Sequence, residues 1–199
     1  MQAAARLLDT ATFDEISVAE ITRAAGVNIG SFYARFPDKN ALLNALYGDY
    51  LSRVEEALEV LEAGNAERTL RERIDLLVDL IARFFRDNRG LVKSAVLHFR
   101  TKTAAADREF PERISRIYRR GAQFLAADRE AIALRAAFAV QTIVFACREI
   151  ILFDGGAVFL DAPVDDRRLA IELQGMLLPY LQAEAGAQTP ASVSKAAAS

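Results

Sequence analysis

The chain has 199 residues, of which 52% are hydrophobic and 26% are charged, and its formal net charge is −2. This composition is typical of a soluble globular protein with one domain or two small ones. One histidine and one cysteine leave little for a disulfide framework, a zinc site or a nucleophile–base pair, so we expect no metal, no cofactor and no catalytic site.

The amino-terminal sequence MQAAARLLDT lacks the basic start and long apolar run of a signal peptide. The longest apolar stretch, at 136–147, is interrupted by Gln141 and Thr142 and is followed by Arg148 and Glu149. A spanning helix needs about 20 apolar residues. We therefore expect a buried helix here, no membrane segment and a cytoplasmic protein.

Short helices joined by tight turns are predicted for the first fifty residues. Ser17 and Glu20 have the spacing of a capping box, which predicts a helix over 18–25. Gly26 would end it with a positive φ, and Asn28 would cap a second helix over 29–36. This is the pattern of a helix-turn-helix, in which the first residues of the second helix enter the DNA major groove. Its small core is expected to contain Val18, Ile21, Ala25, Val27, Phe32 and Phe36.

Longer amphipathic helices follow Pro37, with Asp38 placed to cap the first of them. Apolar residues at helical spacing predict helices over 38–62, 67–87, 90–101, 108–126, 130–153 and 166–181. Pro179 should kink or fray the last one. Residues 184–199 are small, polar and without a face, which predicts a disordered tail. Because no alternating stretch suggests a strand, the sequence predicts an all-α fold of about nine helices.

The segment SVAEITRAAGVNIGSFYARFPDKNALLNAL resembles the DNA-binding segment of the tetracycline-repressor (TetR) family of transcription regulators. The resemblance covers roughly residues 3–50. It implies a three-helix DNA-binding domain at 1–48, joined to a helical ligand-binding and dimerisation bundle at 49–183. It also implies a homodimer that is released from an inverted-repeat operator when a small molecule binds.

The resemblance also implies roles for single residues. Ser17, Tyr33 and Lys39 would contact phosphates, and Thr22 and Arg23 would lie near the DNA backbone. Asn28, Ile29, Gly30 and Ser31 would face bases, whereas Arg35 could reach either bases or phosphate. Two positions depart from the family pattern. Ile29 replaces a frequent lysine and offers apolar contact to a thymine methyl group, and Thr22 replaces a usual alanine.

Charge supports DNA binding only locally, because residues 1–52 contain four basic and six acidic groups. A DNA-binding surface is normally basic. Here the positive contribution must come from Arg23, Arg35 and Lys39, together with the helix N-termini at Asn28 and Asp38. We therefore expect modest affinity per subunit and a need for the dimer.

Between residues 70 and 150 the predicted helices are apolar and rich in aromatic residues, which favours a hydrophobic or amphipathic effector. The candidate ligand-binding residues are Phe84, His98, Phe99, Tyr118, Gln141 and Phe145. Most aromatic residues of this kind are simply core, and His98 could equally be a boundary histidine. Gln141, Thr142 and Arg148 interrupt an apolar helix, so each points either into the cavity or to a dimer interface.

Two other classes of protein compete with a regulator. An enzyme would need a chemical motif, and we find no glycine-rich phosphate loop, no H-E-x-x-H and no G-x-S-x-G. We therefore predict that the chain is not an enzyme. A helical protein that binds a small molecule or a partner, but no operator, remains the alternative.

Overall fold

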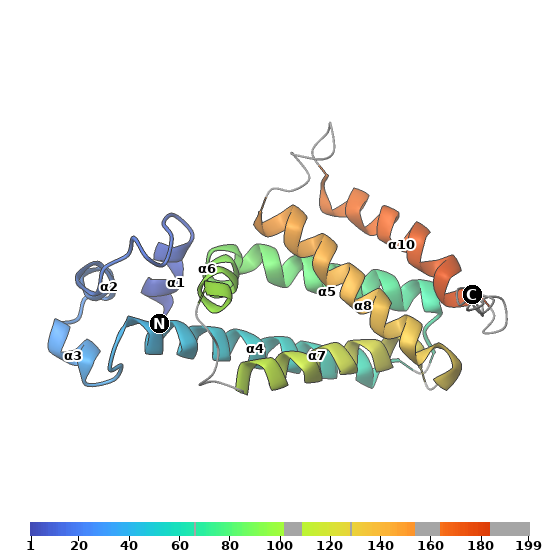
Figure 1. Cartoon of the computed structure of the whole chain (residues 1–199), viewed down its shortest axis with the longest axis horizontal. Helices are drawn as coiled ribbons and strands as arrows, with labels where there is room; N and C mark the ends of the chain where they lie inside the picture. The colour runs from blue at the N-terminus through green and yellow to red at the C-terminus, as the bar shows by residue number, and fades with distance from the viewer. Residues whose placement is uncertain (66, 102–108, 128, 154–163, 184–199) are drawn as a thin grey trace, which may run out of the picture.

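The computed structural model describes residues 1–65, 67–101, 109–127, 129–153 and 164–183 (Figure 1). Within these ranges the chain forms nine α-helices and no strand, as the all-α prediction requires. The helices are α1 (Gln2–Leu8), α2 (Val18–Ala25), α3 (Ile29–Tyr33), α4 (Lys39–Ala63), α5 (Leu70–Asp87), α6 (Arg89–Thr101), α7 (Glu109–Ala126), α8 (Ala133–Cys147) and α10 (Asp166–Gln182). A 3₁₀ turn, η1 (Glu130–Ile132), precedes α8, and a π-helical turn, η2 (Arg148–Leu152), follows it.

The three short helices gather at one end of the molecule, with α3 at its tip (Figure 1). The capping box at α2 is confirmed: the Glu20 amide donates to Ser17 Oγ at 3.2 Å, and the Ser17 amide donates to Glu20 Oε2 at 2.8 Å. Gly26 has a φ of 66°, as predicted for the residue that ends α2. The small core is only partly as predicted, because Val27 is 48% exposed while Ile21 and Phe32 are buried.

Helix α4 runs from this end of the molecule along the bundle (Figure 1). Asp38 caps it by accepting a hydrogen bond from the Ala41 amide at 2.7 Å. Farther along, α4 is tied to α7 by two half-buried ion pairs. Arg113 Nη2 lies 2.7 Å from Glu55 Oε2, and Arg120 Nη2 lies 2.6 Å from Glu62 Oε2. One rigid element thus connects the α3 end of the chain with the bundle.

The bundle core lies between α4, α5, α7 and α8, and α10 covers α5 and α8. Its most deeply buried large side chains include Phe124, Ile74, Leu77 and Ile143. Helix α10 continues past Pro179 to Gln182, close to the predicted end at 181, so the proline does not terminate it. Leu181 beyond the proline is fully buried, and this burial holds the last turn in place. The predicted tail at 184–199 lies outside the described residues.

Two other boundaries differ from the prediction. Helix α3 ends at Tyr33 rather than near Phe36, because the chain already enters a turn before Pro37. The helix predicted over 130–153 begins with η1 and ends with η2, so its winding changes twice.

The stretch Glu130–Leu152 is the one part of the described chain that is long and apolar enough to cross a membrane by length and composition. Core helices of soluble proteins pass the same test. One face of it is core, because Ala136, Ala139, Ile143 and Cys147 have no exposed surface. Only 33% of its most apolar part is buried within the chain, however, so the helix that was expected to be buried is buried on one face.

Candidate nucleic-acid interface and ligand cavity

The first turn of α3 is built to face outward. Asn28 Oδ1 accepts hydrogen bonds from the Ser31 amide at 2.8 Å and from Ser31 Oγ at 3.1 Å, which fixes the start of the helix. All residues from Arg23 to Ser31 are exposed. Since the cap uses the carboxamide oxygen, the amide nitrogen is the group that Asn28 can offer to an acceptor on a base or phosphate.

Gly30 keeps this turn narrow. A Cβ atom at this position would meet only Asn28 Oδ1, at 3.2 Å. The backbone of α3 can therefore approach a flat partner closely, and a larger side chain would stand out from the surface rather than clash with the chain itself.

Apolar side chains flank this turn. Val27, Ile29 and Tyr33 are 48%, 52% and 53% exposed. The Tyr33 ring meets the buried Phe32 ring edge-on at 5.3 Å, which limits the directions in which its hydroxyl can point. Exposed aliphatic groups beside a helix N-terminus can contact thymine methyl groups in the major groove.

The other predicted DNA contacts have different settings. Ser17 is exposed but engaged in the capping box, and Arg23 is exposed. Arg35 is exposed and lies 5.5 Å from the centre of the Phe36 ring. Thr22 does not reach the surface: it is 6% exposed and its hydroxyl donates to the Ala19 carbonyl at 3.0 Å. Its hydroxyl bonds within its own helix, so a DNA contact for Thr22 does not fit this conformation.

Lys39 is turned inward. Its Nζ donates to the carbonyls of Phe13 at 2.7 Å and Ile16 at 2.9 Å, and it lies 4.5 Å from the centre of the Phe13 ring. The ammonium group thus ties the start of α4 to the segment between α1 and α2. A phosphate contact, as implied by the family resemblance, would require these bonds to be given up.

We therefore expect Lys39→Met to act mainly on stability. The loss of charge-assisted bonds to two carbonyls should lower the free energy of unfolding by about 1.5–3 kcal/mol, measured by urea titration. The salt dependence of DNA binding should stay unchanged. A slope of log affinity against log salt that falls by about one would instead show a phosphate contact.

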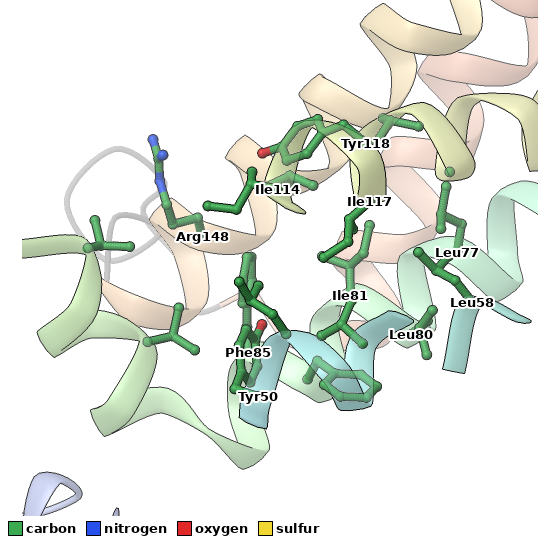
Figure 2. A pocket seen from close by; sticks show the side chains of 18 of the residues that line it. Tyr50, Leu58, Leu77, Leu80, Ile81, Phe85, Ile114, Ile117, Tyr118 and Arg148 are labelled. Carbon is green, nitrogen blue, oxygen red and sulfur yellow. The ribbon is translucent and has the colours of Figure 1, made fainter. Parts of the chain in front are cut away.

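A cavity of about 240 Å³ lies inside the bundle (Figure 2). Most of its wall is aliphatic or aromatic and comes from α4 to α8. Its lining residues are Tyr47, Tyr50, Leu51, Val54, Leu58, Leu77, Leu80, Ile81, Phe84, Phe85, Val92, Val96, Ile114, Ile117, Tyr118, Gly121, Val140, Val144 and Arg148.

Three tyrosines and one arginine supply the polar groups of this wall. Burial raises the pKa of Tyr47 to about 12, and burial also raises the pKa of Tyr50 and of Tyr118. All three phenols are therefore neutral at physiological pH. An apolar cavity with a few fixed hydrogen-bonding groups is the usual form of a small-molecule site.

Some of the predicted ligand-binding residues line the cavity, and others lie outside it. Phe84 and Tyr118 line the cavity. His98 lies elsewhere, with its ring edge-on to Phe13 at 5.3 Å, at the junction of α6 with the amino-terminal helices. Gln141 borders an outer depression between α7 and α8, and Phe145 is 44% exposed. The side chain of the sixth candidate, Phe99, lies outside the described residues.

The sequence analysis did not identify Tyr47 and Tyr50 as cavity residues. For Arg148 it left open whether the side chain points into the cavity or to a dimer interface. Tyr50 belongs to the apolar stripe of α4, which looks the same whether a helix lines a cavity or a filled core. The sequence does single out Arg148, because a cation that interrupts an apolar helix needs a polar partner.

Comparison with known proteins agrees with this geometry. Residues 1–46 match the family model described as "Bacterial regulatory proteins, tetR family". The chain is 32% identical over 95 residues to the HTH-type transcriptional regulator YdgC of Bacillus subtilis, covering 47% of this chain and 49% of YdgC. It is 35% identical over 77 residues to EthR of Mycolicibacterium smegmatis, covering 37% and 35% of the two chains. These matches thus span about half and about a third of the relatives.

Among solved structures, the chain resembles the transcriptional regulator FadR of Bacillus subtilis in complex with stearoyl-CoA. The TM-score is 0.58 at 19% identity, and the match covers 88% of this chain and 94% of FadR. At this identity the likeness concerns the fold. The amino-terminal domain of the chain thus matches the tetR family, and its overall helical fold resembles that of FadR.

Proposed function

We propose that this tetR-family chain is a DNA-binding transcriptional repressor that a hydrophobic or amphipathic small molecule releases from its operator. The observation that supports this proposal is the capped and exposed first turn of α3, at the tip of a domain that matches the family model. Asn28, Ile29, Gly30 and Ser31 would read bases. Ser17, Arg23 and Tyr33 would contact the sugar–phosphate backbone, and Arg35 would reach either the backbone or a base edge.

The connection between α3 and the cavity supports control by a ligand. Helix α4 begins six residues after Tyr33 and contributes five of the cavity-lining residues, Tyr47, Tyr50, Leu51, Val54 and Leu58. A ligand that changes the position of α4 would therefore also change the position of α3.

We place the DNA-binding domain at 1–48 and the ligand-binding and dimerisation domain at 49–183, with α4 crossing the boundary. Regulators of this family are soluble, generally non-enzymatic proteins, and we assign this one to the cytoplasm.

An electrophoretic shift assay with the DNA upstream of the protein's own gene tests the proposal. We expect retardation at nanomolar protein, competed by the same DNA and not by a shuffled sequence of equal composition. A footprint should show an inverted repeat with half-sites about one helical turn, or a multiple of it, apart. Absence of retardation at micromolar protein would favour the alternative, a helical binding protein without an operator.

We further propose a homodimer formed through α8 and α10. These neighbouring helices expose large apolar side chains: Leu134 at 72%, Phe138 at 59%, Ile171 at 51%, Met176 at 52% and Tyr180 at 41%. Large apolar side chains exposed on two packed helices are a frequent mark of an interface. A symmetric dimer would bury it and place two copies of α3 on one DNA duplex.

Phe138→Glu should disrupt the dimer, because the twofold symmetry places two carboxylates in one apolar interface. We expect the dissociation constant of the dimer to rise at least about 100-fold. Sedimentation should show a mass near the single chain's 21.9 kDa at micromolar protein. Val60→Glu on α4, where the native side chain is 73% exposed, serves as the matched control and should stay dimeric. A dimer of unchanged strength in the Phe138 variant would place the interface elsewhere.

A further inference from the structure

Arg148 is the one charged residue among those that line the cavity. It stands where α8 ends and the π-helical turn η2 begins. Such turns widen the helix locally and frequently occur at functional sites. Figure 2 shows Arg148 on the same side of the cavity as the Tyr118 hydroxyl, while Leu58, Leu77 and Leu80 lie on the opposite side.

The partners of Arg148 within the chain do not explain why an arginine is needed there. Its Nε and Nη2 both donate to one oxygen of Glu149, at 3.0 and 2.8 Å, and its guanidinium lies 4.3 Å from the centre of the Phe145 ring. Glu149 is the next residue in the chain and its side chain is 53% exposed. An ion pair of this kind contributes little stability, but it shows that the guanidinium can hold a carboxylate at the cavity's edge.

We propose that Arg148 and the Tyr118 hydroxyl bind the carboxylate of an amphipathic organic acid whose apolar body fills the cavity. The ligand carboxylate would take the place of the Glu149 oxygen, and Glu149 would turn to solvent. This assignment rests on the proposed role of the cavity as the effector site, and it names the chemical class of the effector.

Electrostatics favour a carboxylate over a phosphate. A single guanidinium balances the single charge of a carboxylate and matches its two oxygens, whereas a phosphate monoester would carry nearly twice that charge against the same cation. The positive charge of Arg148 also reaches Tyr118, where it lowers the pKa of the phenol against the larger raising effect of burial. A neutral phenol can donate a hydrogen bond to the carboxylate.

The size of the cavity favours a compact acid. Its volume of about 240 Å³ is somewhat below the roughly 300–1,000 Å³ of sites for drug-sized ligands. A medium-length alkyl chain or a single aromatic ring is therefore a suitable apolar body.

Calorimetric titration of the full chain with octanoate, 1-octanol and octyl phosphate at pH 7.5 tests the proposal. The parent protein should bind octanoate about tenfold or more tightly than either other compound. Arg148→Met, which keeps an unbranched apolar stem, should weaken octanoate binding roughly 10- to 100-fold and leave 1-octanol within about threefold. Tyr118→Phe should weaken octanoate binding several-fold, and Glu149→Gln should strengthen it by removing the competing carboxylate.

Controls separate this proposal from a loss of folding and from failure of the proposed function. Arg83→Met removes an exposed arginine that pairs with Asp79 on α5, and it should bind octanoate like the parent. Arg148→Lys keeps the positive charge but lacks the planar guanidinium, so it should retain part of the preference for octanoate over 1-octanol. This variant tests the proposal even if Arg148→Met folds poorly. Operator binding without ligand is measured independently, so its absence would refute the regulator and not the acid site.

Three results would overturn the acid assignment. They are equal affinity for octanoate and 1-octanol, tighter binding of octyl phosphate, and unchanged octanoate affinity in Arg148→Met. Absence of binding by all three compounds at millimolar concentration would overturn it as well.

Discussion

A leucine at position 30 is expected to abolish operator binding while leaving the fold intact. In the free protein a Cβ atom on Gly30 meets only the cap oxygen of Asn28, at 3.2 Å, so a larger side chain extends outward. In a complex that outward space would be filled by the floor of the major groove. We expect affinity to fall at least about 100-fold, toward the level of nonspecific binding.

The same variant provides its own test of folding. Leucine favours a helix over glycine by up to about 1 kcal/mol, so the unfolding midpoint should not fall. Circular dichroism and the sedimentation mass should match those of the parent. Gly30→Ala should have an intermediate effect on operator binding, because its methyl group fills less of the outward space than the leucine side chain. If Gly30→Leu binds the operator within about threefold of the parent, α3 is not the reading helix and the regulator assignment fails.

The local features of this surface could be predicted because their hydrogen-bond partners are close in sequence. Ser17 and Glu20 are three residues apart, as are Asn28 and Ser31, and the structure confirms both caps. Gly26 could be identified for a similar reason: one residue with positive φ ends α2 and begins the turn.

The role of Lys39 could not be predicted in this way. Its carbonyl partners, Phe13 and Ile16, lie 26 and 23 residues earlier in the chain. No periodicity connects such positions, so a lysine at the start of a helix beside a DNA-binding motif is easily interpreted as a phosphate contact. The burial of Thr22 is missed for the same reason, since it depends on how α2 packs against its neighbours α1 and α3.

The existence of the cavity could not be predicted from the sequence either. Apolar spacing indicates which face of a helix turns inward, but not whether the inward side chains meet or leave space. Of the two phenylalanines proposed for the ligand site, Phe84 lies in the cavity wall, whereas Phe145 turns outward. Helix α8 is apolar on nearly all sides, so its sequence does not distinguish the core face from the exposed face on which Phe138 and Phe145 lie.

The role of Gly90, where α6 meets the end of α1, could not be predicted from the sequence either. The sequence suggested no more than a break between helices at this position. In the structure a Cβ atom on Gly90 would lie 2.1 Å from the Leu8 carbonyl oxygen and 2.7 Å from the Asp9 amide nitrogen. The start of α6 therefore touches the backbone at the end of α1, and only glycine leaves room for this contact.

Gly90→Ala is consequently expected to push α1 away from α6 by about 1 Å or more, since nonbonded carbon contacts prefer 3.5–4.0 Å. Neither partner can yield by a simple side-chain rotation, because both contact atoms belong to the backbone. We expect the free energy of unfolding to fall by about 1–3 kcal/mol and operator affinity to fall about tenfold or more. The second effect follows because α1 packs against α2, so its displacement would change the angle at which the two copies of α3 meet the DNA.

Gly48→Ala on α4 provides the matched control. A Cβ atom there would lie 3.8 Å from Arg113 Nη1 and 3.8 Å from Phe110 Cε1, which is ordinary contact with side chains. This variant should gain up to about 1 kcal/mol of stability from its helix propensity and bind the operator like the parent. Urea titration and operator titration of both variants give the comparison. If Gly90→Ala matches Gly48→Ala in both measurements, the α1–α6 contact does not determine how the DNA-binding helices are held.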